Sequence, residues 1–354
     1  MRKQTNHHHH HRHHHPAQLG RCSALALSLA LALSACGGGG NAGDPLVPGP
    51  DPNLGKLSIT SSNQVAVAQT AVSSSLYFMD SSELLVGAQA NDGKAPTRLA
   101  LALVERAPGW WAKRAATPLV TGAVTAVSEA CSGGGRMDIS LDDKNNNNSF
   151  DAGDSMAIRA VNCVESGSTI NGGIEMVLSS LTGVFGSNNY SAALTLRMDK
   201  LTVVSGQDTA IGHGEMRMES RVTGANNSSV TITVPSFTVS GTLGGVNYSN
   251  SLAGFQLRVA KAPGGTLYNV SVSITGALSG SMIESKQISI ETLAPLVRNW
   301  NAVDPSTGQL LIKGAASSQL RITAQAGGVA LLELDADGNG VFESSTTRRW
   351  SDLR

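Results

Sequence analysis

Two stretches rich in aspartate and asparagine have the spacing of a calcium-binding loop. The first covers residues 143–154, where oxygen-bearing side chains recur at positions 1, 3, 5, 9 and 12. Calcium takes roughly six to eight oxygen ligands, and alternate residues of a tight loop can converge on one ion to supply them. The predicted ligands are Asp143, Asn145, Asn147, the backbone carbonyl of Ser149, Asp151 and Asp154.

The second stretch, residues 335–343, repeats the pattern, with Gly340 at the sixth position where the chain must turn. Its twelfth position is Thr346, so no carboxylate is available there and we expect a weaker grip on calcium. The predicted ligands are Asp335, Asp337, Asn339, the backbone carbonyl of Val341 and Glu343.

Both stretches resemble the calcium loops of EF-hand and dockerin proteins, which implies a structural calcium ion in each. The first departs from that pattern at Asn148, where glycine is usual, although asparagine tolerates a positive φ better than most residues. Residues 137–141 and 329–334, which precede the loops, alternate like strands, so flanking helices are not expected. The alternative is a polar hairpin tip, because Asp, Asn and Gly are also the common turn residues.

Two cysteines, Cys131 and Cys163, bracket the first loop. In an oxidising compartment such an isolated pair is expected to form a disulfide. Closing a loop of this length would stabilise the fold by about 3–4 kcal/mol.

A third cysteine ends the motif Leu33-Ser34-Ala35-Cys36, which follows four basic residues and a short apolar run. The run is shorter than the about 20 residues that a membrane-spanning helix needs, so it is read as a cleaved signal rather than an anchor. The motif resembles the lipobox of bacterial lipoprotein precursors. The resemblance implies cleavage before Cys36 and acyl chains, such as palmitate, on the mature N-terminus. Gly37 replaces the aspartate that retains such proteins in the inner membrane, which favours an outer-membrane anchor facing the periplasm or the cell surface.

The histidine count limits the catalytic possibilities. Eight of the nine histidines precede Cys36 and would leave with the signal, so only His213 remains. A multi-histidine zinc site is then excluded, and any histidine-dependent triad must use His213, which lies between two glycines. Four of the 26 basic residues also lie before Cys36, whereas all 26 acidic residues follow it. The mature chain would therefore be slightly acidic, without the basic surface that nucleic-acid binding requires.

Changes in composition predict four segments: a signal peptide (1–35), a Gly/Pro-rich tether (36–56), an N-terminal helical region (57–118) and an antiparallel β domain holding both acidic loops (119–354). Within the helical region, apolar spacing predicts helices over residues 63–79 and 97–107. The pair Trp110-Trp111 follows them. Indole pairs can stack on sugars or lie at a bilayer surface, but packing in the core is the favoured interpretation here.

Period-two alternation dominates from residue 119 onward. Met216 and Met218 alternate with charged residues, and a regular run from Val230 to Val234 changes phase at Pro235, which is typical of a bulge or of an edge strand. We therefore predict a mainly β fold: a curved antiparallel meander, arranged as a sandwich or an open barrel, with the short N-terminal helical region packed on it.

Three functions are compatible with these features. The favoured one is a non-catalytic, membrane-anchored envelope lipoprotein, and so not an enzyme, whose β domain is braced by calcium and a disulfide. The second is a carrier of an apolar ligand or lipid. Inward-facing Met216, Met218 and Met282 would suit an adaptable cavity, and they fit an ordinary core equally well. The third, a glycan-acting enzyme, needs two carboxylates about 5–9 Å apart, and the sequence singles out no such pair.

The order Cys131, acidic loop, Cys163, strand-rich tail and terminal Trp350 also resembles secreted β-rich lipoproteins of Gram-negative bacteria. This resemblance covers the chain loosely and implies no activity and no particular protein or ligand partner.

Overall fold

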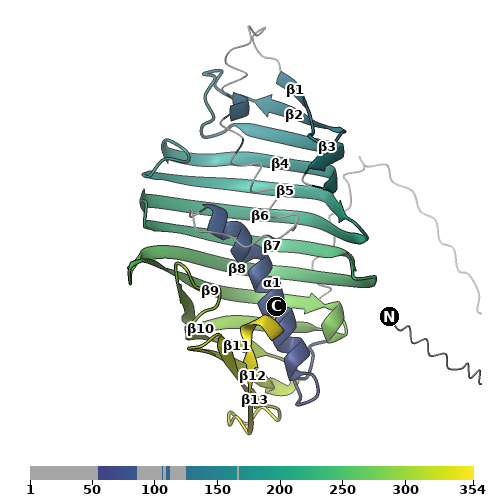
Figure 1. Ribbon diagram of the computed structural model, residues 1–354, viewed down its shortest axis with the longest axis vertical. Helices are drawn as coiled ribbons and strands as arrows, with labels where there is room; N and C mark the ends of the chain where they lie inside the picture. The colour runs from purple at the N-terminus through teal and green to yellow at the C-terminus, as the bar shows by residue number, and fades with distance from the viewer. Residues whose placement is uncertain (1–54, 86–105, 107–108, 112–124, 166) are drawn as a thin grey trace, which may run out of the picture. The chain divides into compact units, whose positions relative to one another are not determined.

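A single antiparallel sheet organises the protein in the computed structural model (Figure 1). The structure describes residues 55–85, 106, 109–111, 125–165 and 167–354, and for residues 76–85 the backbone only. The predicted signal peptide, Cys36, nearly all of the tether and the helix predicted over 97–107, apart from Arg106, lie outside the described residues.

Within the described residues, fourteen strands follow one another in chain order, and each pairs antiparallel with the next, so the sheet is one open meander. The mainly β prediction is therefore confirmed, in the arrangement of one open sheet with a helix packed on it. The strands are β1 Thr125–Ala130, β2 Arg136–Asp142, β3 Ser155–Glu165, β4 Ser168–Gly183, β5 Tyr190–Ser205, β6 Asp208–Gly224, β7 Asn227–Leu243, β8 Val246–Gly264, β9 Leu267–Gly280, β10 Gln287–Asn299, β11 Thr307–Lys313, β12 Gln319–Gln325, β13 Val329–Asp335 and β14 Ser344–Arg349.

Side chains along strands β2 to β13 alternate between a buried apolar face, called the inner face here, and a polar face. Met216 and Met218 are almost fully buried, at 1% and 2% exposure, while Arg217 between them is exposed. On the polar face, charges of opposite sign meet across strands: Arg197 in β5 lies 3.0 Å from Glu215 in β6. The predicted alternation thus places the core on one side of the sheet.

A row of irregularities crosses six neighbouring strands, from β4 to β9. It confirms the bulge predicted at Pro235, beside which the register of β6 against β7 shifts between Glu215 and Arg217. Gly214 needs its positive φ of 138° there, and a Cβ on it would lie 2.5 Å from the Ser236 carbonyl oxygen. Bulges increase the local twist, so the row bends the long strands together. Its members are Gly172, Lys200, Gly214, Pro235, Gly254 and Gly276.

Helix α1 (Gln64–Leu85) lies on the inner face, against β7, β8, β9 and β12 (Figure 1). It confirms the helix predicted over 63–79 and extends six residues further. Small and β-branched side chains, including Ala68, Ala71 and Val72, face the sheet and allow a close approach. Just before the helix, Asn63 Oδ1 accepts a hydrogen bond from the Thr60 N–H at 2.8 Å, and the Asn63 carbonyl accepts from the Val67 N–H at 2.9 Å. Within the described residues, no helix has both the length and the apolar character needed to cross a bilayer.

The segment before α1, residues 55–59, is attached to the C-terminal part of the sheet. Leu57 N–H donates to the Gln287 carbonyl at the start of β10 (3.0 Å), and Ile59 N–H donates to the Ser318 hydroxyl (2.9 Å). Ser318 lies just after the 3₁₀ turn η2 (Ala315–Ser317) and is fully buried. Residues 55–59 are therefore clamped between β10 and η2.

Candidate functional site

Both acidic loops are hairpin connections of the sheet. The first joins β2 to β3, and the second joins β13 to β14. The strands predicted before each loop are confirmed, which leaves no flanking helices of the EF-hand kind at either loop.

In the second loop, side-chain oxygens accept hydrogen bonds from the loop's own backbone. The Asp335 carboxylate, at position 1, accepts from the N–H of Asn339 (3.2 Å) and of Gly340 (2.9 Å). Asp337 accepts from the N–H of Asn339 at 3.1 Å, and Asn339 accepts from the N–H of Val341 at 2.7 Å. The chain is thus wound around the oxygens of positions 1, 3 and 5.

The first loop repeats these four hydrogen bonds position for position. Asp143 accepts from the N–H of Asn147 (3.3 Å) and of Asn148 (2.9 Å). Asn145 accepts from the N–H of Asn147 at 3.0 Å, and Asn147 from that of Ser149 at 2.7 Å. Two loops separated by about half the chain therefore share the same backbone hydrogen bonds to positions 1, 3 and 5.

The backbone φ angles at positions 4 and 6 are also alike in the two loops. Positions 4 and 6 have positive φ in both loops: 56° and 59° at Asn146 and Asn148, and 74° and 87° at Gly338 and Gly340. Asparagine at position 6 of the first loop thus takes the conformation that glycine takes in the second.

The carboxylates converge more closely in the second loop. One carboxylate oxygen each from Asp335, Asp337 and Glu343 lies within 4.8 Å of the others. In the described part of the chain, the acids of the first loop form no such group. There the side-chain amides of Asn145 and Asn147 donate to Asp151, so their N–H groups face the carboxylate. The geometry favours the second loop as the better prepared cation site, whereas the sequence favoured the first.

Asp154, at position 12 of the first loop, is fully buried. Its carboxylate accepts hydrogen bonds from the N–H of Lys144 (2.9 Å) and of Asp151 (2.8 Å). Burial raises the pKa of Asp154, and repulsion from the carboxylates of Asp151 and Asp143 adds to that, while the two backbone hydrogen bonds lower it. A cation in the loop would relieve both the burial cost and the repulsion.

A phenylalanine at position 8 ties each loop to the fold, a feature that the ligand spacing did not reveal. Phe150 packs on Trp111, with ring centroids 5.4 Å apart. Phe342 lies under the Arg321 guanidinium (4.0 Å), which in turn makes two hydrogen bonds of 2.8 Å to Glu333. Trp110 and Trp111 are themselves buried, at 3% and 2% exposure, in agreement with the core interpretation of this pair.

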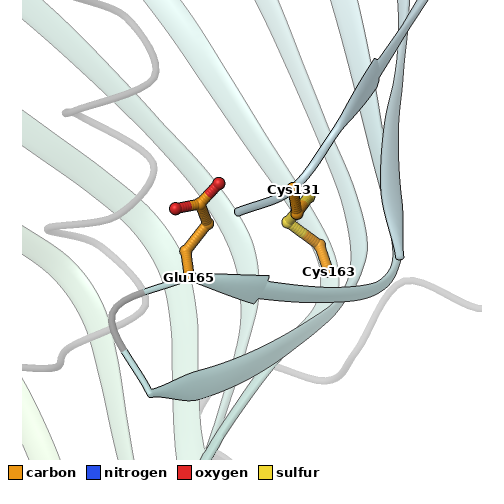
Figure 2. A group of neighbouring side chains, drawn as sticks. All are labelled: Cys131, Cys163 and Glu165. Atoms are coloured by element: carbon orange, nitrogen blue, oxygen red, sulfur yellow. A yellow bond between two sulfur atoms is a disulfide. The ribbon is translucent and has the colours of Figure 1, made fainter. Parts of the chain in front are cut away.

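Cys131 and Cys163 form the expected disulfide, with a sulfur–sulfur distance of 2.01 Å (Figure 2). It joins the β1–β2 turn to β3, at the end of the β2–β3 pair opposite the first acidic loop. Figure 2 shows Glu165 beside it, and this carboxylate accepts from the Ser132 N–H (3.1 Å) and hydroxyl (2.8 Å), which lowers the pKa of Glu165. Because both sulfurs are in the disulfide, they do not offer thiolates to a metal.

The sequence analysis also singled out His213 and Met282, and the structure places one within the sheet and the other on an exposed turn. His213 lies in β6 within the row of bulges, where its Nδ1 accepts from the Lys200 N–H (3.3 Å) and lies 3.6 Å from an Asp199 oxygen. Met282 was expected to face inward with Met216 and Met218, but it is 56% exposed on the turn η1 (Ser281–Ile283), which corrects that prediction. It lies outside the strand alternation because the chain leaves β9 at Gly280.

Comparison with protein-family models, with curated proteins and with solved structures finds no match to the chain. The candidate site therefore rests on its own geometry.

Proposed function

We propose that the chain is a non-catalytic lipoprotein of the bacterial cell envelope, anchored by acyl chains on Cys36, whose sheet is a rigid scaffold braced by a disulfide and by calcium at both acidic loops. The anchor places the sheet on the periplasmic side or the surface of the outer membrane. Its exposed polar face is the surface offered to partners.

One observation carries the calcium part of the proposal: the same four hydrogen bonds recur at positions 1, 3 and 5 of both loops. A polar hairpin tip needs only a turn, whereas this pattern fixes side-chain oxygens of positions 1, 3 and 5 in both loops, and in the second loop the carboxylate oxygens of Asp335, Asp337 and Glu343 also converge. Calcium accepts such a mixture of carboxylates, amide oxygens and backbone carbonyls.

The role proposed for the ion is structural. Each loop closes a two-strand connection near one edge of the open sheet, β2–β3 at one end of the strand order and β13–β14 at the other. Edge strands pair on one side only and fray most readily, so an ion at each outermost region would stabilise the whole sheet. Extracellular calcium is plentiful enough to keep weak sites occupied.

Thermal melting of the full chain in calcium and in EDTA tests this proposal. At calcium about 100-fold above its dissociation constant, one site adds about 2.7 kcal/mol to the free energy of unfolding, so the midpoint should rise in calcium. Because Asp335→Asn and Asp143→Asn also alter loop hydrogen bonds, the quantity to compare is the difference between the two midpoints for each variant.

We expect Asp335→Asn to remove the larger part of that difference, Asp143→Asn the smaller part, and the double variant all of it. Glu219→Gln, an exposed acid on the polar face of β6, is the matched control and should keep the full difference. Equal midpoints for the unaltered chain in calcium and in EDTA would refute the calcium proposal.

A further inference from the structure

Three large apolar side chains are exposed at one end of the long strands. Leu243 and Val246 are 67% and 69% exposed and lie opposite each other at the tip of the β7–β8 hairpin. Met282, on the turn η1 that follows β9, is 56% exposed. Because β9 runs antiparallel to β8, β9 finishes at the end of the sheet where β8 begins. The turns 205–208, 243–246 and 281–286 therefore share one end, called the entry end here.

The apolar side chains of the entry end are held on ordered turns. At the hairpin tip, the Gly244 N–H donates to Asp208 Oδ1 at the start of β6 (2.8 Å), which braces the tip against the neighbouring hairpin. In η1, the Ser281 hydroxyl accepts from the Ser249 N–H of β8 (3.4 Å), and Ile283 is buried in the core. The structure thus presents these side chains to solvent from fixed positions.

The chain enters the described fold at this same end. The Leu57 N–H donates to the Gln287 carbonyl (3.0 Å), and the Gln287 N–H donates to the Gly55 carbonyl (3.3 Å). Lys56 therefore pairs with Gln287 in the parallel direction. Because β10 begins at Gln287 and runs away from the entry end, residues 55–57 also run inward from it. The sequence between Cys36 and Gly55 is thus attached to the sheet at its entry end.

The charges on the described turns of the entry end balance. Lys286 pairs with Glu284 at 2.6 Å, and the exposed Lys56 offsets Asp208. Such a surface has aliphatic groups at its tips and no excess of either sign of charge. It fits the interface of a bilayer of neutral lipids, where binding strength depends on the apolar area that is buried.

We propose that the entry end lies against a lipid bilayer, with Leu243, Val246 and Met282 inserted at its interface. The inference rests on the anchor proposed at Cys36 and adds to it which end of the sheet faces the membrane. Val184 and Leu267 are also exposed, but they lie at the opposite end of the strands, where the chain does not enter. That opposite end would face away from the bilayer.

Tryptophan fluorescence of the acylated chain in phosphatidylcholine vesicles tests this contact, because brominated lipid chains quench only those indoles that touch them. The emission that Leu243→Trp or Met282→Trp adds to that of the unaltered chain should be lost when brominated phosphatidylcholine replaces the ordinary lipid. Val184→Trp is the matched control, at a position 72% exposed on the opposite end, and its added emission should remain.

A second comparison places charge at the tip. The pair Leu243→Asp and Val246→Asp should remove most of the quenching from Met282→Trp, whereas Val184→Asp should leave it unchanged. All three positions are exposed, so the substitutions spare the core.

The intact mass of each sample separates this inference from the anchor. Acyl groups on Cys36 together with an unquenched Leu243→Trp, or with equal quenching of Val184→Trp, would refute the membrane contact of the entry end alone. A sample that carries no acyl groups would refute the anchor, and the contact with it.

Discussion

Asp154 is a buried carboxylate of the first acidic loop, and a bound cation would stabilise its charged form. Its carboxylate is sealed from solvent and held by two backbone N–H groups, with Asp143 and Asp151 close enough to repel it. Burial raises its pKa above the ordinary value of 3.8. Without a cation the folded state therefore holds the Asp154 proton more tightly than the unfolded state does, and stability falls as pH rises from 3.8 through the raised pKa.

Calcium should reverse this behaviour, because a cation favours the ionised form. We predict that the pKa of Asp154, followed by carboxyl-carbon NMR, lies above 3.8 in EDTA and falls when calcium is added. Asp199, exposed on the polar face, is the reference resonance and should not respond to calcium. A pKa of Asp154 that is the same in calcium and in EDTA would mean that no cation enters the first loop.

At the scale of elements, the second loop is linked to the segment that leads into α1. Gly338 packs against η2, and a Cβ on it would lie 2.5 Å from the Ala316 carbonyl oxygen. The same turn leads to Ser318, whose hydroxyl holds Ile59. The order of the loop should therefore influence how firmly residues 55–59 are clamped.

Gly338→Ala should destabilise the protein more than Gly340→Ala. Both residues have positive φ, which costs a non-glycine residue about 1–2 kcal/mol, but a Cβ on Gly340 meets no atom within 4 Å. Denaturant unfolding measures the two losses, and hydrogen exchange measures the Ile59 amide, which should exchange faster only in Gly338→Ala. Equal losses, or an unchanged Ile59 amide, would break the proposed link.

Much of this element structure could be predicted from the sequence, because alternation is a local property. The runs around Met216 and Val230 identify the inner face, and Pro235 identifies one bulge because it interrupts a regular run. The remaining bulges could not be predicted, since Gly172 and Gly254 look like ordinary turn glycines until their neighbours in adjacent strands are known.

The relative quality of the two loops also depends on information beyond the sequence. Ligand spacing favours the first loop, which has a carboxylate at position 12. Only the structure shows that Asn145 and Asn147 turn their amide N–H groups toward Asp151, while the acids of the second loop converge. The direction in which a side-chain amide points depends on contacts in the folded protein, and the spacing of residues in the sequence does not reveal it.

At the scale of the whole molecule, the acyl anchor proposed at Cys36 would attach a long open sheet to the membrane. The sheet has one apolar face for the core and one charged face for solvent, a disulfide near β1 and an acidic loop toward each end of the strand order. The proposed scaffold would use attachment at one point, a braced sheet and an extended polar surface. Of these features, the disulfide is the one that depends on the oxidising compartment that acylation of Cys36 would imply.

Membrane fractionation of cells expressing the unaltered chain or Cys36→Ser, together with the intact mass of the purified protein, tests whether Cys36 carries the anchor. We expect the unaltered protein to sediment with outer membranes and to have the mass of the chain from Cys36 onward plus acyl groups. Cys36→Ser should leave that fraction. An unacylated Cys36 on a chain that still carries residues 1–35, or a Cys36→Ser variant that stays with the membrane, would contradict the account.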